Sequence, residues 1–142
     1  MSAAVEIVRS FYEDIWNRGD LEAATRLCAE DLVFRGSLGD SSVGRDAFLD
    51  YVRRVRGALD DYRCVIEETV VEGDRVFARM TFSGLSAGPL LGHAPTHRRV
   101  SWAGAARFLL REGRIADLWV LGDRRDLESQ LARPWGGDGC SG

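Results

Sequence analysis

The first sixty residues show the spacing of amphipathic helices. Apolar side chains recur every three or four positions over residues 3–17, which predicts a helix that ends at an Asn-Arg-Gly segment. A shorter helix is expected over residues 20–28, with Asp20 as its N-cap, and a third over residues 44–59. Between these two, residues 31–36 have the composition of a short strand, and a loop rich in Gly and Ser follows.

The period changes to two in the second half of the chain. Alternation there predicts four strands in two hairpins, at residues 62–71, 75–84, 100–111 and 114–121. A loop connects the two hairpins, and a short terminal helix is expected at residues 126–131. Helices followed by long hairpins predict an α+β fold, in which a curved antiparallel sheet packs on the N-terminal helices and leaves an internal pocket.

The length of 142 residues fits one domain, expected at residues 1–133, and residues 134–142 have so little apolar content that we expect a flexible tail. The chain has 19 basic and 22 acidic side chains and a net charge of -3, with no basic run. This balance argues against binding to nucleic acid or to an anionic membrane. All the basic residues other than histidine are arginine, which excludes Schiff-base chemistry and a phosphate-binding lysine.

The three cysteines, Cys28, Cys64 and Cys140, show neither metal-binding nor disulfide spacing. We interpret them as reduced thiols of a cytoplasmic protein. The N-terminus lacks a basic stretch followed by an apolar core, and no apolar run approaches the roughly 18 residues that a membrane span needs. Secretion and membrane insertion are therefore disfavoured.

His93 and His97 are the only histidines, and a spacing of four would suit a metal pair on a helix. Pro95 lies between them and breaks any such helix. Neither a metal nor another cofactor is expected, since the chain also lacks a nucleotide-binding glycine motif and a nucleophile elbow.

The second hairpin suggests a candidate catalytic carboxylate. A regular ladder about its two-residue turn pairs Trp102 with Asp123 and places Trp119 and Leu121 on the same face. Desolvation on such a face raises the pKa of a carboxyl group, which suits a general acid or base. The alternative stays open that Asp123 caps the terminal helix or pairs with a neighbouring arginine.

Aromatic side chains are expected to line the pocket for a flat, hydrophobic ligand. These candidates are Tyr12, Trp16, Phe34, Trp102 and Trp119. Gly104 and Ala106 share their sheet face and leave volume above it. That volume suits a ligand, and equally the close packing of a helix or a second subunit.

Several segments resemble one known family. They are Phe11–Leu21, Glu72–Val76, Thr81–Gly84, Ala94–Thr96 and Gly113–Ile115, the last followed by Trp119 and Asp123. In this order and spacing they resemble the SnoaL-like polyketide cyclase and ester cyclase family, within the nuclear transport factor and ketosteroid isomerase superfamily. The resemblance covers about residues 3–131.

The resemblance implies a cone-shaped α+β barrel with a deep apolar pocket, often dimeric through its sheet. It also implies a cofactor-free intramolecular aldol closure of an aromatic polyketide, and hence a hydrophobic small-molecule substrate. In the family's cyclases the aspartate at the end of the last strand acts as acid/base, and Asp123 stands at that position. One placed carboxylic acid and a shaped cavity suffice when the enolate is delocalised over fused rings.

The chain departs from the family pattern at two places. Gly84-Leu85-Ser86 stands where many relatives have Gly-Thr-His, so a common histidine is missing. His97 stands where relatives have a glycine after Pro-Thr, which makes it a candidate pocket residue.

Two other functions remain open. One is epoxide opening of the limonene-epoxide hydrolase type, in which an arginine bridges paired carboxylates. Arg79 and Arg107 could supply that guanidinium, and Arg107 is counted as a pocket candidate, although neither stands in an Arg-x-Asp sequence. The other is a non-catalytic module that binds a small molecule or a second copy of itself.

Overall fold

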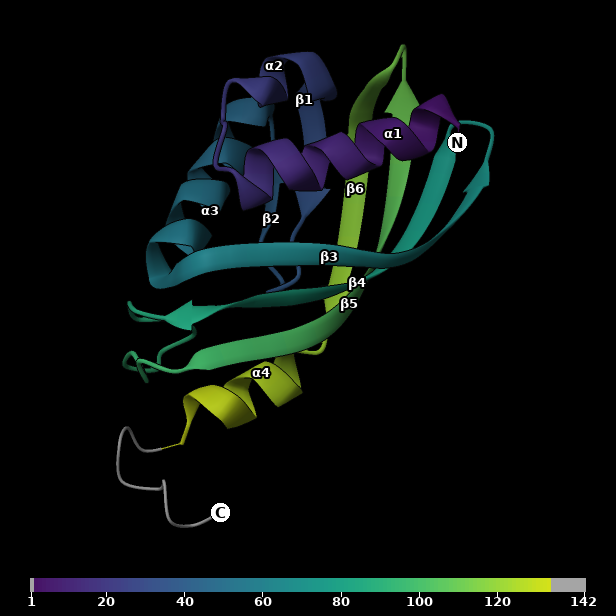
Figure 1. Cartoon of the computed structure of the whole chain (residues 1–142). Coiled ribbons are helices and arrows are strands. Elements are labelled where there is room, and N and C mark those ends of the chain that lie inside the picture. Colours follow the sequence, from purple (N-terminus) through teal and green to yellow (C-terminus); the bar gives the residue numbers. More distant parts are fainter. Residues whose placement is uncertain (1, 134–142) are drawn as a thin grey trace.

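A computed structural model of the chain describes residues 2–133, so the tail expected at residues 134–142 lies outside the described residues. The described chain is an α+β domain with one curved six-stranded sheet, and the N-terminal helices lie across one side of it (Figure 1). The elements are α1 (Ala3–Ser10), the π-helix η1 (Phe11–Asn17), α2 (Ala23–Leu27), β1 (Cys28–Arg35), β2 (Ser41–Val43), α3 (Arg45–Ala58), β3 (Leu59–Glu72), β4 (Arg75–Ser86), β5 (Arg99–Arg111), β6 (Arg114–Gly122) and α4 (Arg124–Leu131).

The sheet has the strand order β2-β1-β6-β5-β4-β3. The expected curved, antiparallel sheet is confirmed in four of its five strand pairs, and the exception is β1 with β6, which run parallel. β1 follows the first helices in the sequence and pairs with β6, the last strand of the described chain. The sheet does not close into a barrel, since β2 and β3 remain its two edges.

The N-terminal segment differs from the single α-helix expected over residues 3–17. The α-helix ends at Ser10 and continues as η1, which has one extra residue in each hydrogen-bonded turn. The next helix is shorter than expected and begins at Ala23 without a side-chain cap, so Asp20 is not its N-cap. Cys28 already belongs to β1, where it pairs with Ile115 of β6. Pairing with the sheet therefore ends the helix before Cys28.

The hairpin of β5 and β6 contains a β-bulge that the sequence analysis did not anticipate. Arg111 pairs with Arg114 as expected, but the register shifts between Leu109 and Leu110, so that Arg107 pairs with Trp119. Because side chains alternate across a strand, a shift of one residue moves every later side chain of β6 to the opposite face. The expected common face of Trp102, Trp119 and Asp123 is wrong for this reason.

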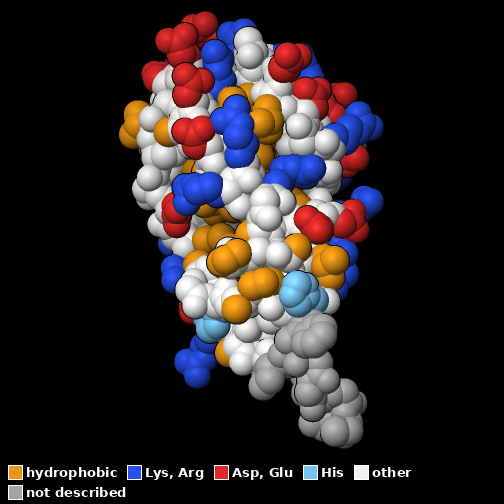
Figure 2. Space-filling model, turned by 90° about the vertical axis from the view of Figure 1, so that its left-hand side faces the viewer, with side chains coloured by type: hydrophobic (Ala, Val, Ile, Leu, Met, Phe, Trp, Pro, Cys, Tyr) orange, Lys and Arg blue, Asp and Glu red, His pale blue; other side chains and the backbone are white. Residues whose placement is uncertain are grey.

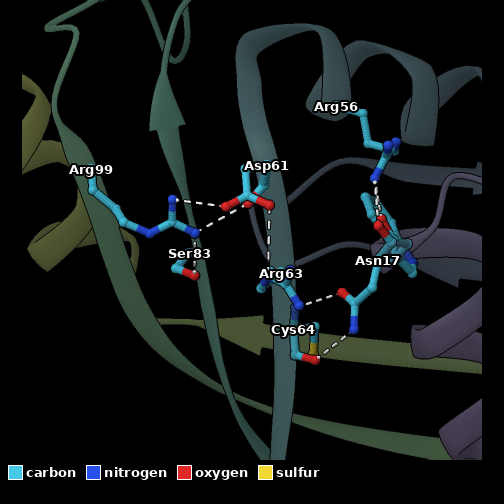
Figure 3. A network of polar contacts seen from close by, with 8 residues as sticks. Asn17, Arg56, Asp61, Arg63, Cys64, Ser83 and Arg99 are labelled. Carbon is cyan, nitrogen blue, oxygen red and sulfur yellow. Dashed lines mark hydrogen bonds and ion pairs between the residues drawn. The ribbon is translucent and has the colours of Figure 1, made fainter.

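Two amide side chains from helical segments form hydrogen bonds with the backbone of strands. Asn17 donates to the carbonyl oxygen of Cys64 at 3.1 Å and accepts from its N–H at 2.7 Å, which fastens the end of η1 to the edge strand β3 (Figure 3). Gln130 of α4 makes the same pair of bonds with the backbone of Ser101 in β5. An amide offers one donor and one acceptor, as a neighbouring strand would, so both contacts satisfy backbone groups that the sheet leaves unpaired.

Candidate functional site

An aromatic cavity lies between the helices and the sheet. It is lined by Phe11, Tyr12 and Trp16 of η1, Phe34 of β1, Ser37 of the loop after β1, Tyr51 and Val55 of α3, Tyr62 of β3, Phe82 of β4 and Val120 of β6. We call this space the aromatic cavity. Its volume of about 10 Å³ has room for one water molecule. A larger ligand therefore has to displace side chains as it enters.

The π-helix directs two aromatic side chains into the cavity. The wide turn of η1 places both Tyr12 and Trp16 on the cavity side. The Trp16 ring lies against Tyr62 of β3, with 5.1 Å between ring centroids, and across the cavity the Phe34 ring lies 5.2 Å from that of Tyr51. These ring contacts join the helices to the sheet through the wall of the cavity.

The cavity wall has no charged side chain among its lining residues, and the polar side-chain groups of these residues are three tyrosine hydroxyls, the Ser37 hydroxyl and the indole N–H of Trp16. Burial is the main cause that raises the pKa of Tyr12 and Tyr62 well above the usual tyrosine value, and it raises the pKa of Tyr51 to about 12. All three hydroxyls therefore stay protonated near neutral pH. The cavity presents neutral O–H groups on an apolar surface.

A surface groove adjoins the aromatic cavity at Tyr51 and Val55, which line both. We call it the mouth groove. Its volume is about 330 Å³, and its other lining residues are Leu38, Asp40, Arg54, Ala58, Pro89, Leu90 and Leu91. Figure 2 shows this side of the molecule, with hydrophobic side chains gathered beside the two histidines. Tyr51 and Val55 therefore form a wall that the mouth groove and the aromatic cavity have in common.

A tight turn forms one rim of the mouth groove. Leu90 and His93 bond to each other through their backbones in both directions, and Leu91 between them has a φ of 51°. A bulky side chain in this left-handed region is strained. The strain is offset by contact, since Leu90 and Leu91 pack against the hydrophobic core. His93 also lies 3.7 Å from Glu128, which connects the rim to α4.

Asp123 lies at the N-terminus of α4 and is exposed. Its carboxylate accepts a hydrogen bond from the backbone N–H of Asp126 at 3.1 Å, so it caps this helix. The expected position on the cavity wall is therefore wrong, because the inward residues at the end of β6 are Val120 and Gly122. The acid/base role of Asp123 is a separate matter and stays a prediction.

The remaining predicted pocket residues divide into buried and outer positions. Trp102 is 2% exposed, and its ring packs at a tilt against that of Phe82, with 5.3 Å between centroids, one layer behind the cavity wall. His97 is exposed in the loop before β5, and its N–H bonds to Ser86. Neither is among the residues that line the aromatic cavity.

Trp119 and Arg107 lie on the outer face of the sheet, so their expected pocket positions are wrong. The bulge in the β5–β6 hairpin turns Trp119 outward, where it is 41% exposed. Arg107 lies beside it and forms an ion pair with Asp117. On the same face, the guanidinium of Arg35 stands 5.8 Å above the Trp119 ring.

Comparison with models of known protein families shows which family the chain belongs to. The model of the SnoaL-like polyketide cyclases matches residues 6–131. The chain belongs to the SnoaL-like polyketide cyclase family. A search among proteins of curated function found none that matches this SnoaL-like chain.

Solved structures of several other proteins have the same fold. TsrD from Streptomyces laurentii is 28% identical with a TM-score of 0.81, over 92% of this chain and 95% of TsrD. IdmH from Streptomyces antibioticus, described as a polyketide cyclase, is 25% identical with a TM-score of 0.79, over 92% of this chain and 99% of IdmH. An epoxide hydrolase of the LEH-like type from M. tuberculosis shares the fold at 19% identity and a TM-score of 0.73, over 91% of this chain and 89% of its own.

The sequence analysis of this SnoaL-like chain missed several cavity residues, above all Tyr51, Tyr62 and Phe82. A signal for them was present. Tyr51 lies on the apolar face of its helix, and Tyr62 and Phe82 occupy inward positions of alternating strands. Which of these core positions border empty space depends on how the helices cross the sheet.

The cysteines of the described chain are unsuited to nucleophilic chemistry. Burial raises the pKa of Cys28 to about 12 and that of Cys64 further still. Within residues 2–133, no group of three or more His, Cys, Asp or Glu side chains is placed to hold a metal ion. No helix in this part of the chain is long and apolar enough to cross a membrane.

Proposed function

We propose that the chain is a cofactor-independent cyclase or isomerase that acts on a polyketide-like hydrophobic intermediate in the aromatic cavity. The observation that carries the proposal is the cavity wall, which combines flat aromatic rings with hydroxyl groups and has no charged side chain. Aromatic walls bind flat apolar ligands, and a shaped cavity holds a flexible chain in a reactive conformation. The proposal includes a cytoplasmic location, where the free thiols of Cys28 and Cys64 stay reduced.

The proposal assigns proton transfer to Asp123. Its neighbour Gly122 packs against Ser37 of the cavity wall, because a Cβ at Gly122 would lie only 2.8 Å from the carbonyl oxygen of Ser37. Asp123 is thus one residue away from the wall. Its carboxylate accepts one backbone hydrogen bond, which leaves lone pairs that can take a proton.

In an aldol closure the carboxylate removes a proton from the carbon next to a substrate carbonyl, and the enolate attacks a second carbonyl of the same molecule. The new carbon–carbon bond leaves an alkoxide, which takes the proton back from the carboxylic acid. Substrate and product therefore have the same mass, and no oxidant or reductant is consumed.

Epoxide opening is the second candidate that the fold suggests. That chemistry needs carboxylates bridged by an arginine at the substrate. Arg107 and Asp117 form a single, partly buried ion pair on the outer face beside Trp119, and neither residue lines the aromatic cavity. The proposal therefore favours cyclisation or isomerisation.

Incubation of the purified chain with an uncyclised aromatic polyketide ketone, without added cofactor, tests the proposal. We expect a product of unchanged mass whose rate of formation is proportional to protein concentration. An epoxide substrate converted to a product heavier by one water would instead support the hydrolase. Binding of the ketone without any turnover would reject an enzyme and leave a binding module.

We further propose a homodimer formed through the outer face of the sheet. Apolar side chains are exposed there on neighbouring strands, and we call this surface the outer apolar face: Val33, Val43, Val70, Phe77, Trp119 and Leu121. The register places Trp119, Arg107 and Phe77 side by side across β6, β5 and β4. Apolar patches of this extent on a sheet favour a partner surface, and a second copy supplies the same apolar residues.

Trp119→Glu is expected to weaken dimerisation roughly tenfold or more, because it places a charge where two apolar faces meet. Light scattering over a range of protein concentrations measures the change. Thr25→Glu on the exposed surface of α2 is the matched control and should leave the dimer intact. A wild-type protein that is monomeric at high micromolar concentration would refute the dimer.

A further inference from the structure

Trp102 carries a buried hydrogen-bond donor without an acceptor. Its side chain is 2% exposed, and within residues 2–133 its indole N–H has no hydrogen-bond partner. Two other buried side-chain atoms of the described chain lack partners, in Ser42 and Arg107, but those two residues are partly exposed and line a groove on the outer face. Trp102 has no such access to water, and an unpaired buried donor is unfavourable unless an acceptor reaches it.

The indole lies on the face of the sheet that borders the aromatic cavity. Trp102 of β5 is the register partner of Phe82 in β4, and directly paired residues of antiparallel strands point to the same face. Phe82 lines the cavity, and its ring packs against the indole with 5.3 Å between centroids. The unpaired donor therefore belongs to a side chain directly beside the cavity wall.

The nitrogen of the indole faces a position that has no side chain. A Cβ at Gly122 of β6 would lie 3.1 Å from Nε1 of Trp102 and 3.0 Å from Cβ of Ser37. A side chain at residue 122 would therefore cover the indole N–H. With glycine at this position, the neighbour on the far side is Ser37, which is itself a residue of the cavity wall.

Ser37 is the part of the cavity wall that can move most easily. The other nine lining residues are buried and belong to helices or strands. Ser37 is partly exposed and lies in the turn between β1 and β2, which also contains Gly36 and Gly39. A surface turn can shift without uncovering the hydrophobic core. A shift of Ser37 opens the cavity toward Gly122 and the indole N–H.

The unpaired donor and the cavity wall together select one class of ligand. An N–H group needs an acceptor, and an oxygen with free lone pairs supplies it. No lining side chain can neutralise an anion, and an unpaired ion in an apolar site is very unfavourable. The fitting ligand is thus neutral, with a carbonyl oxygen on a flat aromatic body that packs against the rings of the wall.

We propose that the indole N–H of Trp102 binds the carbonyl oxygen of a neutral aromatic ketone that enters the aromatic cavity and displaces Ser37. The inference rests on the proposed function and deepens it, because it assigns a donor to the ketone that becomes the enolate. The hydrogen bond strengthens as negative charge develops on that oxygen, and the indole keeps its proton.

The backbone places this donor near the residue to which we assign proton transfer. The N–H of Asp123 donates to the carbonyl oxygen of Ala103 at 2.8 Å, and Ala103 is the residue after Trp102 in β5. A carbonyl held by Trp102 therefore lies at the same end of the sheet as Asp123. Asp123 remains the group that moves the proton.

Proton–nitrogen NMR observes the proposed hydrogen bond directly. The chain has four tryptophans, each with one indole N–H signal, and the Trp102 signal is the one that Trp102→Phe removes. 1-Tetralone is a neutral aromatic ketone, and tetralin is a hydrocarbon of similar shape that has the same ring-current effect without an acceptor. We expect 1-tetralone to move the Trp102 indole proton of the wild type downfield, and tetralin not to do so.

Binding constants from calorimetry provide the second readout. Trp102→Phe removes the donor and keeps an aromatic ring beside Phe82, so 1-tetralone binding should weaken roughly 3–10-fold, with tetralin binding unchanged or improved. Trp119→Phe is the matched control, since Trp119 lies on the outer face, and it should preserve both affinities. Thermal unfolding verifies that each variant is folded, and the NMR titration of the wild type does not depend on them.

Three results would overturn the inference: no binding of 1-tetralone to the wild type, an indole signal that tetralin moves as far as 1-tetralone does, or equal losses of both probes in Trp102→Phe. On a polyketide ketone that the wild type cyclises, Trp102→Phe should lower kcat more than it raises KM. A chain that shows the ketone-specific indole shift but cyclises no polyketide ketone would refute the proposed function alone.

Discussion

Replacing Asp123 by asparagine is expected to lower the turnover of a cyclisable polyketide ketone roughly 10²–10⁴-fold and to leave the thermal unfolding midpoint unchanged. The two effects separate because the residue has two tasks. Its side-chain oxygen caps α4 by accepting from Asp126, and an asparagine oxygen accepts this bond equally well. An asparagine cannot take up and return a proton. Steady-state rates and thermal melts of the same samples measure both effects.

Asp123→Ala is the complementary variant. Alanine removes the cap as well as the proton carrier, so we expect the same loss of turnover together with a loss of about 1 kcal/mol in the free energy of unfolding. Full turnover in Asp123→Asn would refute the acid/base role and leave Asp123 as a helix cap. The affinity for the polyketide ketone should stay within a few-fold of the wild type in both variants, since Asp123 does not line the aromatic cavity.

Gly104→Ala is expected to destabilise the protein by about 3 kcal/mol, the upper end of the cost of overpacking a core. A Cβ at residue 104 would lie 2.3 Å from Cε2 of Phe82 and 3.1 Å from the carbonyl oxygen of Leu121. The Phe82 ring is 2% exposed and packs against Trp102, so it has little room to move away from an added methyl group. Chemical denaturation measures the loss.

Gly57 provides the matched control for this glycine. It lies in α3, and an added Cβ meets no atom within 4 Å. Gly57→Ala should therefore stabilise the protein by about 0.4–1 kcal/mol, since alanine favours the helix and restricts the unfolded chain. Combining Gly104→Ala with Phe82→Leu should recover part of the lost stability. An unchanged denaturation midpoint in Gly104→Ala would contradict the close contact with Phe82.

Local patterns predicted most of the elements. The helical spacing near residues 44–59 corresponds to α3, and the alternating segments correspond to β3 through β6 within about three residues at each end. Amphipathic periodicity succeeds at these places because one side of each element is buried and the other is exposed. It failed at Cys28, where apolar character is shared by a helix end and a buried strand and only the pairing with Ile115 decides between them.

The candidate site was less predictable than the elements. Tyr12, Trp16 and Phe34 were selected as aromatic residues on predicted apolar faces, and all three line the aromatic cavity. Trp119 was selected by the same reasoning but lies on the outer face of the sheet. The β-bulge adds one residue to β6 opposite Leu109 and Leu110 of β5, and every later side chain of β6 therefore points to the face opposite to the expected one. A bulge leaves little trace in hydrophobic alternation when both faces of a strand carry apolar residues, as they do in β6.

By itself, the sequence determined the α+β class, the approximate extent of the helices and strands, and the resemblance to the SnoaL-like family, because these depend on local spacing and short motifs. Only the tertiary structure decided which residues meet. It brought Tyr12 and Tyr62 together from elements fifty residues apart, placed Asp123 at a helix cap and turned Trp119 and Arg107 to the outer face. The physical reason is that the packing of the whole core sets the strand register and the way the helices cross the sheet. No single segment of the sequence contains the information for that packing.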